Sequence, residues 1–567
     1  MDLKMALAHA LAPSTGLDSQ QLYQLIEVPP QRSMGDYAFP CFALAKTLRK
    51  APPAIAAELA GSLTLPEGIS SVTPLGPYLN FFADPAQRAR AVLSAIHTQG
   101  ERYGSSDEGQ GRVITIDYSS INIAKPFHIG HLSTTVIGHA LYNLYGFLGY
   151  HPIGINHLGD WGTQFGKLIV AFHRWGDRQR IEEGGVRQLL EIYVRFHDEA
   201  EKDDTLNQEA RAAFKRLEEG DQESLALYHW FKDITLREVS HIYDMLGIQF
   251  DSYNGESFYN DKMDRVIDEL KEKHLLVQDK GAWVVEFPEE EKMPPCLILK
   301  ADGATLYATR DIAAALYRKE HYHFYQSLYV VAYQQNLHFR QFFKVVEMMG
   351  YDWAKDMKHI AFGMVSMEEG TLSTRSGRVI FLDEVFRKAT ERALALIEEK
   401  SPGLENKAVV AQQVGVGALV YSTLSASRIK DITFSWDRAL NFEGETGPYC
   451  QYTYARCCSV LRKAPGALPA HEDIDDDALT DEYAQELLRQ MGDFPAAIRR
   501  AVAENEPFVV TRAVTLICQA YNKFYDKKRI LDAPPHERDA RLSLISAARL
   551  VIQTGLSLLG IQAPERM

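Results

Sequence analysis

The 567-residue sequence has no apolar run long enough to cross a membrane. Its first residues, MDLKMALAHALAP, include an early Asp and too short an apolar stretch for a secretory signal. It has only six cysteines, without regular spacing. Cys450, Cys457 and Cys458 lie near one another, but no second cluster completes a zinc-binding pattern. We therefore expect reduced thiols, no protein-bound metal, no membrane partner and a cytoplasmic location.

Positive charge is also scarce, because 61 Lys and Arg residues face 75 Asp and Glu residues and the net charge is −14. Contacts to nucleic acid phosphates need Lys and Arg, so composition alone argues against a nucleic acid partner unless basic residues gather on one face. The length predicts about three domains with a large core. A hydrophobic content of 46% and a charged content of 24% are ordinary for a globular protein.

One stretch, Arg112–Gly149, is typical of a strand followed by a turn and a helix. Residues 113–116 form a short β-branched apolar run, which suits a buried parallel strand. The polar turn that follows contains Pro126, which disfavours helix immediately before it. Beyond the turn, apolar residues recur every four positions until Gly149 closes the predicted helix.

His128 and His131 stand at the start of this helix, three residues apart on one face. A helix N-terminus has unpaired N–H groups and partial positive charge, and ligands of open α/β sheets bind beyond the carboxyl ends of the strands. Each imidazole can donate a hydrogen bond to a phosphate, while Gly130 lets a flat base approach the backbone. The alternative is that both histidines only cap and pack the helix.

The segment NIAKPFHIGH (122–131) resembles the HIGH motif of class I aminoacyl-tRNA synthetases, in the form found in arginyl-tRNA synthetases. Further blocks resemble the same family in the same order: HLGDWGTQFGK (157–167), LYATRDIAAA (306–315), VVAYQQNLH (330–338), FEGETGPYCQYTYAR (442–456) and APERM (563–567). The resemblance covers essentially the whole chain. It implies an arginine–tRNA ligase that uses ATP, accompanied by Mg²⁺, to form arginyl-adenylate and then transfers arginine to the 3'-terminal adenosine of tRNA(Arg).

The resemblance also implies an α/β multidomain fold. Residues 1–95 form a small α/β accessory domain that grips the outer corner of the tRNA, although on their own they could be a structural appendage. Residues 110–385 form a Rossmann-like catalytic domain with a parallel sheet and an insertion over about 168–300, helical to about 248. Residues 386–567 form a helical stem and an all-α anticodon-binding domain. Members of the family are usually monomers, and we expect a monomer here.

The resemblance assigns the chemistry on ATP to two segments. The residues implied in catalysis are Lys125, His128, Gly130 and His131, and those implied in ATP binding are Asn122, Ile123, Ala124, Pro126, Phe127, Ile129, Ser373, Thr374 and Arg375. Residues 368–385 correspond to the KMSKS-like loop, whose lysines hold pyrophosphate in the family. Thr371 and Ser376 replace both lysines here, so we expect Lys125 to take over their role with help from Arg375.

A pocket for arginine needs negative charge and planar acceptors, because guanidinium has five donors and stays charged. On residues alone, Asp117 and Asp311 are two carboxylates among many, and Asp311 could simply pair with Arg310. The resemblance implies that Tyr307 and Asp311, four apart on one helical face, bind the guanidinium. It implies further arginine contacts from Gln335 and, around the α-amino and carboxylate groups, from Asp117, Ser120 and Asn122.

Near the start of the C-terminal region, Tyr449, Tyr452 and Arg456 combine aromatic rings with positive charge, which suits stacking on unpaired bases. Spacing alone favours an aromatic core stripe, for these residues and for YNKFYDKKR (521–529), whereas the resemblance implies tRNA binding. Two rival functions remain. One is a small-molecule adenylyl-transferring enzyme, against which the helical domain argues. The other is a regulator that binds tRNA or arginine without catalysis, supported only by the missing loop lysines.

Overall fold

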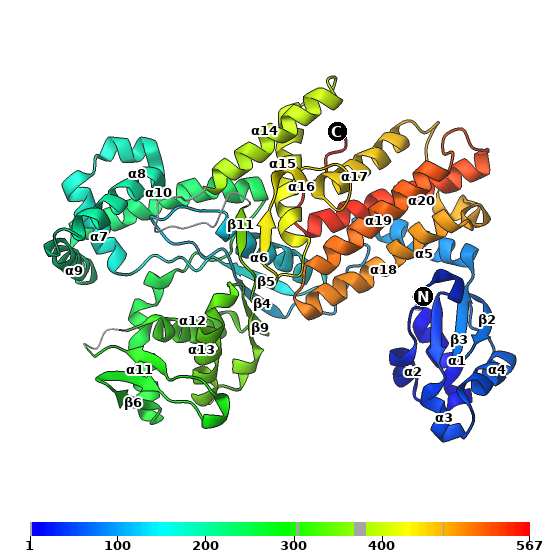
Figure 1. Cartoon of the computed structure of the whole chain (residues 1–567), viewed down its shortest axis with the longest axis horizontal. Coiled ribbons are helices and arrows are strands. Elements are labelled where there is room, and N and C mark those ends of the chain that lie inside the picture. The colour runs from blue at the N-terminus through cyan, green and yellow to red at the C-terminus, as the bar shows by residue number, and fades with distance from the viewer. Residues whose placement is uncertain (1–2, 302–304, 368–380, 469) are drawn as a thin grey trace. The chain divides into compact units, whose positions relative to one another are not determined.

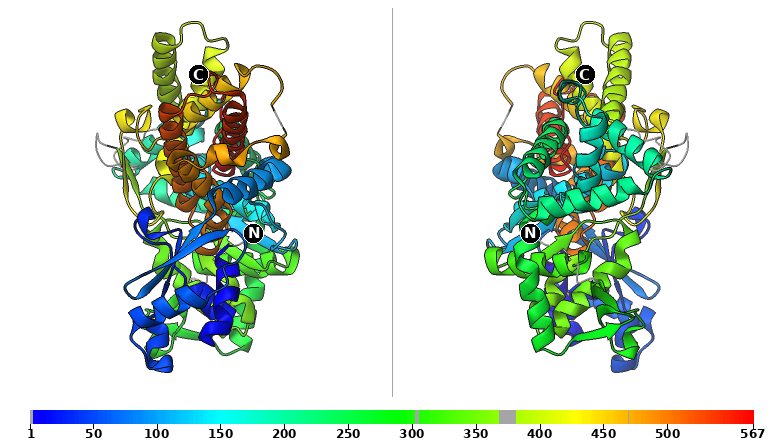
Figure 2. Two further views of the ribbon diagram at one scale, coloured as in Figure 1. Left: turned by 90° about the vertical axis from the view of Figure 1, so that its right-hand side faces the viewer. Right: turned by 90° about the vertical axis from the view of Figure 1, so that its left-hand side faces the viewer.

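The computed structural model describes residues 3–301, 305–367, 381–468 and 470–567, drawn in Figures 1 and 2. The chain forms two compact units. Unit 1 contains Met1–Tyr103, Cys457–Asp493 and Leu516–Ile552, and unit 2 contains Gly104–Arg456, Phe494–Thr515 and Gln553–Met567. Unit 1 therefore combines the N-terminal segment with parts of C-terminal helices, so each unit is built from segments far apart in the sequence.

The N-terminal segment is a small α/β domain, as predicted. Its antiparallel sheet has the strand order β1-β3-β2, and apolar side chains such as Phe39 and Phe81 are fully buried between the sheet and its helices. The strands are β1 (Tyr37–Pro40), β2 (Ile69–Leu75) and β3 (Tyr78–Ala83). The helices are α1 (Leu3–Thr15), α2 (Ser19–Leu25), α3 (Phe42–Leu48), α4 (Pro52–Ser62) and α5 (Pro85–Gln99).

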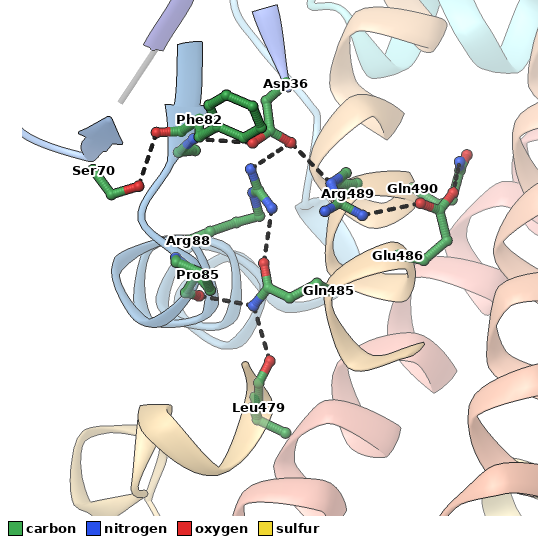
Figure 3. A network of polar contacts seen from close by, with 11 residues as sticks. Asp36, Ser70, Phe82, Pro85, Arg88, Leu479, Gln485, Glu486, Arg489 and Gln490 are labelled. Atoms are coloured by element: carbon green, nitrogen blue, oxygen red, sulfur yellow. Dashed lines mark hydrogen bonds and ion pairs between the residues drawn. The ribbon is translucent and has the colours of Figure 1, made fainter. Parts of the chain in front are cut away.

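Within unit 1, Asp36 ties this sheet to two helices (Figure 3). Its carboxylate accepts the N–H of Ala83 at 2.9 Å and forms ion pairs with Arg88 of α5 at 2.7 Å and with Arg489 of α18 (Glu482–Glu504) at 3.0 Å. Burial opposes the charge of Asp36, but Arg88, the N–H of Ala83 and Arg489 together outweigh it and hold its pKa below the usual value.

The core of unit 2 is a parallel sheet with the strand order β10-β9-β4-β5. Helix α6 (Gly130–Phe147) carries the chain from β4 to β5, and the chain later returns on the other side of β4 as β9. The carboxyl ends of β4 and β9 therefore form a topological switch point, where open α/β sheets bind ligands. The strands are β4 (Val113–Asp117), β5 (His151–Ile155), β9 (Gln326–Tyr329) and β10 (Met357–His359).

The predicted insertion follows β5. Helices α7 to α10 gather into one bundle (Figure 1) and confirm the helical character expected to about residue 248. A small antiparallel sheet of order β6-β7-β8 follows and packs with α11, α12 and α13 around one apolar core. The helices are α7 (Thr163–Trp175), α8 (Arg178–Ala200), α9 (Thr205–Glu218), α10 (Gln222–Leu246), α11 (Met263–Glu272), α12 (Tyr307–Tyr322) and α13 (Asn336–Met348). The strands are β6 (Leu276–Asp279), β7 (Ala282–Val285) and β8 (Cys296–Leu299).

The C-terminal region is mainly helical, as predicted, with one exception. Strand β12 (Ile432–Phe434) pairs in parallel with β11 (Val365–Met367) inside the stretch that we expected to be almost wholly helical. Its sequence, Ile-Thr-Phe, has β-branched and aromatic residues that favour a strand once a partner edge is available. The helices are α14 (Leu382–Lys400), α15 (Lys407–Leu424), α16 (Trp436–Ala439), α17 (Gly447–Arg462), α18, α19 (Phe508–Lys527) and α20 (Pro535–Leu558). None of the helices in the described ranges is long and apolar enough to traverse a lipid bilayer.

Candidate active site

The turn between β4 and α6 is strained. Ser119, Ser120 and Ala124 all have positive φ, at 67°, 45° and 57°, a conformation that non-glycine residues rarely adopt outside functional sites and tight turns. Neighbouring helices hold this turn in place. The N–H of Ser119 donates to Thr134 of α6 at 3.1 Å, and the N–H of Ala124 donates to Thr235 of α10 at 3.0 Å.

Backbone hydrogen bonds fix the tautomers of the two motif histidines. The N–H of Gly130 donates to Nδ1 of His128 at 3.1 Å, and the N–H of His128 donates to Nδ1 of His131 at 3.2 Å. A backbone N–H only donates, so both Nδ1 atoms accept and each neutral ring carries its proton on Nε2. Burial lowers the pKa of His128, and burial together with the charge of His128 lowers that of His131 to about 3. The site therefore has two neutral Nε2–H donors.

Gly130 leaves the space that the imidazole of His128 occupies. A Cβ atom at this position would lie 2.8 Å from Cε1 and 2.9 Å from Nδ1 of His128. We interpreted the glycine as room for a flat base, whereas the structure shows that the space is needed for the neighbouring imidazole. A larger residue would displace His128 from the backbone N–H that sets its tautomer.

Lys125 projects from the same turn with its side chain exposed. Desolvation within the crowded turn lowers the pKa of Lys125, and the carboxylate of Glu256 partly opposes this shift. Within the described ranges, no carboxylate lies at ion-pair distance from its ammonium group. Lys125 therefore has no carboxylate counter-charge among the described residues.

The segment that corresponds to the KMSKS-like loop ends beside this turn. The N–H of Leu382 donates to the carbonyl of Phe127 at 2.8 Å, and Phe381 forms a β-bridge with His128. Ser373, Thr374 and Arg375 lie outside the described residues, so their predicted ATP contacts and the help expected from Arg375 stay predictions.

On the arginine side, α12 presents Tyr307 and Asp311 one helical turn apart, as predicted. The ring of Tyr307 is 69% exposed, so it is open to a ligand. Asp311 does not pair with Arg310, the alternative considered from the sequence. Its carboxylate meets Nε2 of His338 at 2.6 Å, while Arg310 lies 3.8 Å from Glu256.

Glu256 is a candidate that the sequence did not reveal. Burial raises its pKa to about 7; Arg310 opposes this shift, and the nearby Asp311 and Asp160 carboxylates add to it. A buried carboxyl that partly resists ionisation, as Glu256 does, favours the approach of one more cation. Glu256 comes from the insertion, far in sequence from every motif. Next to it, a Cβ at Gly255 would clash with Leu158 and Asp160, so the backbone packs closely against these residues.

The residues predicted around the α-amino and carboxylate groups lie at the end of β4 and beyond it. One oxygen of Asp117 accepts a hydrogen bond from the hydroxyl of Ser120 at 2.6 Å, and the other lies 2.7 Å from Nη2 of Arg318. Asn122 packs against Gly159, where a Cβ would lie 2.5 Å from its Oδ1. Gln335 ends the 3₁₀ turn Tyr333–Gln335 with its side chain exposed.

His157 shows that these two groups of residues belong to one neighbourhood. Burial lowers the pKa of His157, and the carboxylates of Asp117 and Asp311 both act on it in the opposite direction. The acid at the end of β4 and the acid on α12 therefore both lie within electrostatic range of the His157 ring.

The candidate tRNA contacts lie on α17. Tyr454 is buried, so part of the aromatic stripe is core, as spacing alone suggested. Tyr452 is 39% exposed, with the guanidinium of Arg456 4.9 Å from its ring centroid, and Tyr449 is half-buried. In unit 1, Tyr521 is likewise core. Tyr452 and Arg456 thus form an accessible stacked pair that suits a base and a phosphate.

Metal ligands do not gather in the described residues. No group of three or more His, Cys, Asp or Glu side chains in them could hold an ion. Cys450, Cys457 and Cys458 are buried free thiols.

Three family models match consecutive parts of the chain. The arginyl tRNA synthetase N terminal domain matches residues 1–83, the class I (R) tRNA synthetase catalytic domain matches residues 92–436, and the DALR anticodon binding domain matches residues 450–567. The chain belongs to the arginyl-tRNA synthetase family. The arginine–tRNA ligases of Alkaliphilus metalliredigens and Clostridioides difficile are each 52% identical to it over 567 residues, which is 100% of each chain.

Solved structures agree with this family. The arginyl-tRNA synthetase of Thermus thermophilus superposes with a TM-score of 0.81 at 25% identity, covering 100% of this chain and 99% of the other. The enzyme of Plasmodium falciparum has the same fold, with a TM-score of 0.77 at 22% identity over 96% and 94% of the two chains. The arginyl-tRNA synthetase fold predicted from the sequence, with its parallel-sheet catalytic domain and helical C-terminal domain, is therefore confirmed.

Proposed function

We propose that this member of the arginyl-tRNA synthetase family is an arginine–tRNA ligase. It activates L-arginine with ATP and transfers the arginyl group to the 3'-terminal adenosine of tRNA(Arg). The observation that carries this proposal is the pair of neutral Nε2–H donors at the start of α6, in a chain that matches arginine–tRNA ligases over its full length.

In the activation step, a carboxylate oxygen of arginine bonds to the α-phosphorus of ATP and the bond to the leaving pyrophosphate breaks. The protein's task is to align these groups and to stabilise the charge that develops on the phosphates. His128 and His131 donate their Nε2 protons in hydrogen bonds to phosphate oxygens, beside the positive end of the α6 dipole. Mg²⁺ enters with ATP as part of the substrate.

Lys125 supplies the positive charge that the KMSKS-like loop provides elsewhere in the family. Two features support this role: both loop lysine positions are substituted, and Lys125 is exposed and without a carboxylate partner in the described ranges. The strained turn surrounds the nucleotide and is formed by Asn122, Ile123, Ala124, Pro126, Phe127 and Ile129.

The guanidinium group of arginine binds between Asp311, Tyr307 and Glu256. The short contact of Asp311 with His338 orients its carboxylate, and Glu256 adds charge once a substrate cation favours its ionised form. Asp117, Ser120 and Asn122 surround the α-amino and carboxylate groups, and Gln335 contributes from the 3₁₀ turn that follows β9.

The tRNA binds to the N-terminal domain and to the helical domain, where Tyr449, Tyr452 and Arg456 meet unpaired bases. A net charge of −14 leaves little general attraction for RNA, so local pairs such as Tyr452 and Arg456 supply the contacts. The enzyme acts in the cytoplasm as a monomer.

The experiment that tests this function is arginine-dependent ATP–pyrophosphate exchange, with and without tRNA, beside transfer of labelled arginine to that tRNA. Exchange together with charging supports the ligase, and exchange that needs tRNA would show that activation depends on it. Exchange without charging would favour the small-molecule enzyme. No exchange from folded protein that still binds tRNA would favour the regulator.

A further inference from the structure

Arg318 is a charged side chain that the activity described so far does not use. It lies on α12 with 1% of its side chain exposed, and it is among the largest fully buried side chains in the described residues. Buried arginines are rare unless they are paired, because removing a guanidinium from water is costly. Its partner is Asp117, whose Oδ2 lies 2.7 Å from Nη2 of Arg318 and whose side chain is 9% exposed.

The other groups that act on Arg318 are phenols rather than carboxylates, and one of them, the hydroxyl of Tyr259, accepts a side-chain hydrogen bond from its guanidinium group. Tyr329 of β9 places its ring centroid 5.4 Å from the guanidinium carbon. Among the described residues, neither Nε nor Nη2 of Arg318 has a hydrogen-bond partner, so Nη2 meets Asp117 as an ion pair. The carboxylate of Asp117 is therefore the main counter-charge of Arg318. Each of these two buried charges is compensated mainly by the other, so the contact fixes the position of both side chains.

The contact joins the two ends of the proposed arginine site. Arg318 lies two helical turns beyond Asp311, on the same face of α12. Asp117 ends β4, and its other oxygen receives the hydroxyl of Ser120 in the strained turn. The helix that reads the guanidinium is thus connected to the strand end that meets the α-amino group.

We infer that Arg318 is a positioning residue for substrate arginine: it holds the Asp117 carboxylate, with Ser120, in the orientation that receives the α-ammonium group. This role rests on the proposed function and on the contact that it assigns to Asp117. Arg318 itself does not touch the substrate. The competing explanation is an ion pair that only stabilises the fold.

The two explanations differ in which ligand is affected. Arginine makes the α-ammonium contact, whereas 5-guanidinopentanoate, which is arginine without its α-amino group, does not. A positioning role predicts that Arg318→Met weakens arginine binding about tenfold or more while changing the affinity for the deamino analogue less than about twofold. A purely structural role weakens both ligands by the same factor.

Competition equilibrium dialysis with labelled arginine on the full chain measures both affinities, and circular dichroism checks that each variant is folded. Arg265→Met is the matched control, because Arg265 also pairs with a carboxylate of α12, that of Glu320, but the pair is exposed. It should change neither affinity. If Arg318→Met does not fold, Arg318→Lys is used instead, because lysine keeps the charge but lacks the planar guanidinium group. The lysine variant should again lose affinity for arginine and not for the deamino analogue.

Equal weakening of both ligands in a folded variant would overturn the inference. Wild-type protein that binds arginine and the deamino analogue equally well would overturn it too, because Asp117 would then make no contact with the α-ammonium group. Arginine-dependent exchange by that wild-type protein would still leave the proposed ligase activity standing, so the two failures are distinguishable.

Discussion

The phosphate half and the arginine half of the candidate site are built in opposite ways. The phosphate half is one contiguous stretch, 122–131, with two neutral donors and the cation Lys125. The arginine half draws on separate segments of unit 2, and its acids already have basic partners in the chain. These pairs are Asp117 with Arg318, Asp160 with Lys232, Asp311 with His338 and Glu256 with Arg310.

This difference follows from the charge of each ligand. Phosphates are anions in any conformation, so a helix start with fixed N–H donors binds them without distant support. A pocket for a cation needs several carboxylates close together, and these repel one another unless the protein supplies counter-charges. The two weakest counter-charges are nearest the proposed guanidinium position: Arg310 lies 3.8 Å from Glu256, and the partner of Asp311 is a histidine, which is charged only when it is protonated. The substrate guanidinium can therefore replace or reinforce the weakest counter-charges without disturbing the buried ones.

The largest expected effect comes from removing Lys125, the cation that the described residues supply to the phosphate half. Lys125→Ala should lower the rate of ATP–pyrophosphate exchange about 10²- to 10³-fold, because a charge-assisted contact to the developing phosphate charge is lost. The affinity for arginine should stay unchanged. Steady-state exchange kinetics with varied ATP and arginine measure both.

Lys125→Arg is the control, since it keeps the charge and should retain most of the exchange activity. Unimpaired exchange in Lys125→Ala would show that the phosphate half does not depend on this cation. Another group would then have to replace the two lysines that the KMSKS-like loop lacks.

In the arginine half, Asp311→Asn should reduce kcat/KM for arginine about 100-fold while leaving KM for ATP unchanged, because the amide keeps the shape but loses the charge that guanidinium needs. Arginine-dependent exchange measures the two parameters separately. Asp268→Asn removes an exposed acid that pairs with Lys271 on α11 and should have no effect. Equal losses for arginine and ATP would mean that the two halves are not independent.

A sharper comparison uses the fixed tautomer of His131. The amide nitrogen of Gln can reach the position of Nε2, whereas Asn reaches only as far as Nδ1, so the two substitutions test the two ring nitrogens separately. We expect His131→Asn to lower kcat/KM for ATP about 30-fold and His131→Gln to lower it clearly less. Exchange assays with varied ATP decide between them, and the reverse order would assign the functional proton to Nδ1.

The same division explains how much could be predicted from the sequence. The strand, turn and helix around His128 were predictable because periodicity, Pro126 and the histidine spacing are local signals. Tyr307 and Asp311 were placed on one helical face by the resemblance of residues 306–315 to the family, which is also a local stretch of sequence. Glu256 and Arg318 were not found, because their partners Arg310 and Asp117 lie 54 and 201 positions away in the chain. Only tertiary packing brings such pairs together, and no period or motif in the sequence records it.

The smallest expected effect is on the free energy of unfolding, and it comes from the buried neutral histidines of α6. Burial lowers the pKa of His131 to about 3 and that of His139, also on α6, to about 4. Both values lie below the pKa of about 6.5 in an unfolded chain, so as pH falls through that value the unfolded state takes up protons first and stability is lost. Between pH 7.5 and pH 5.5, each group should lower the free energy of unfolding by about 1 kcal/mol. Urea denaturation at the two pH values measures this loss. His139→Gln should remove the part of this loss that comes from His139 and leave exchange activity intact. If the free energy of unfolding of that variant falls between the two pH values as much as that of the wild type, His139 is not held neutral in the folded protein.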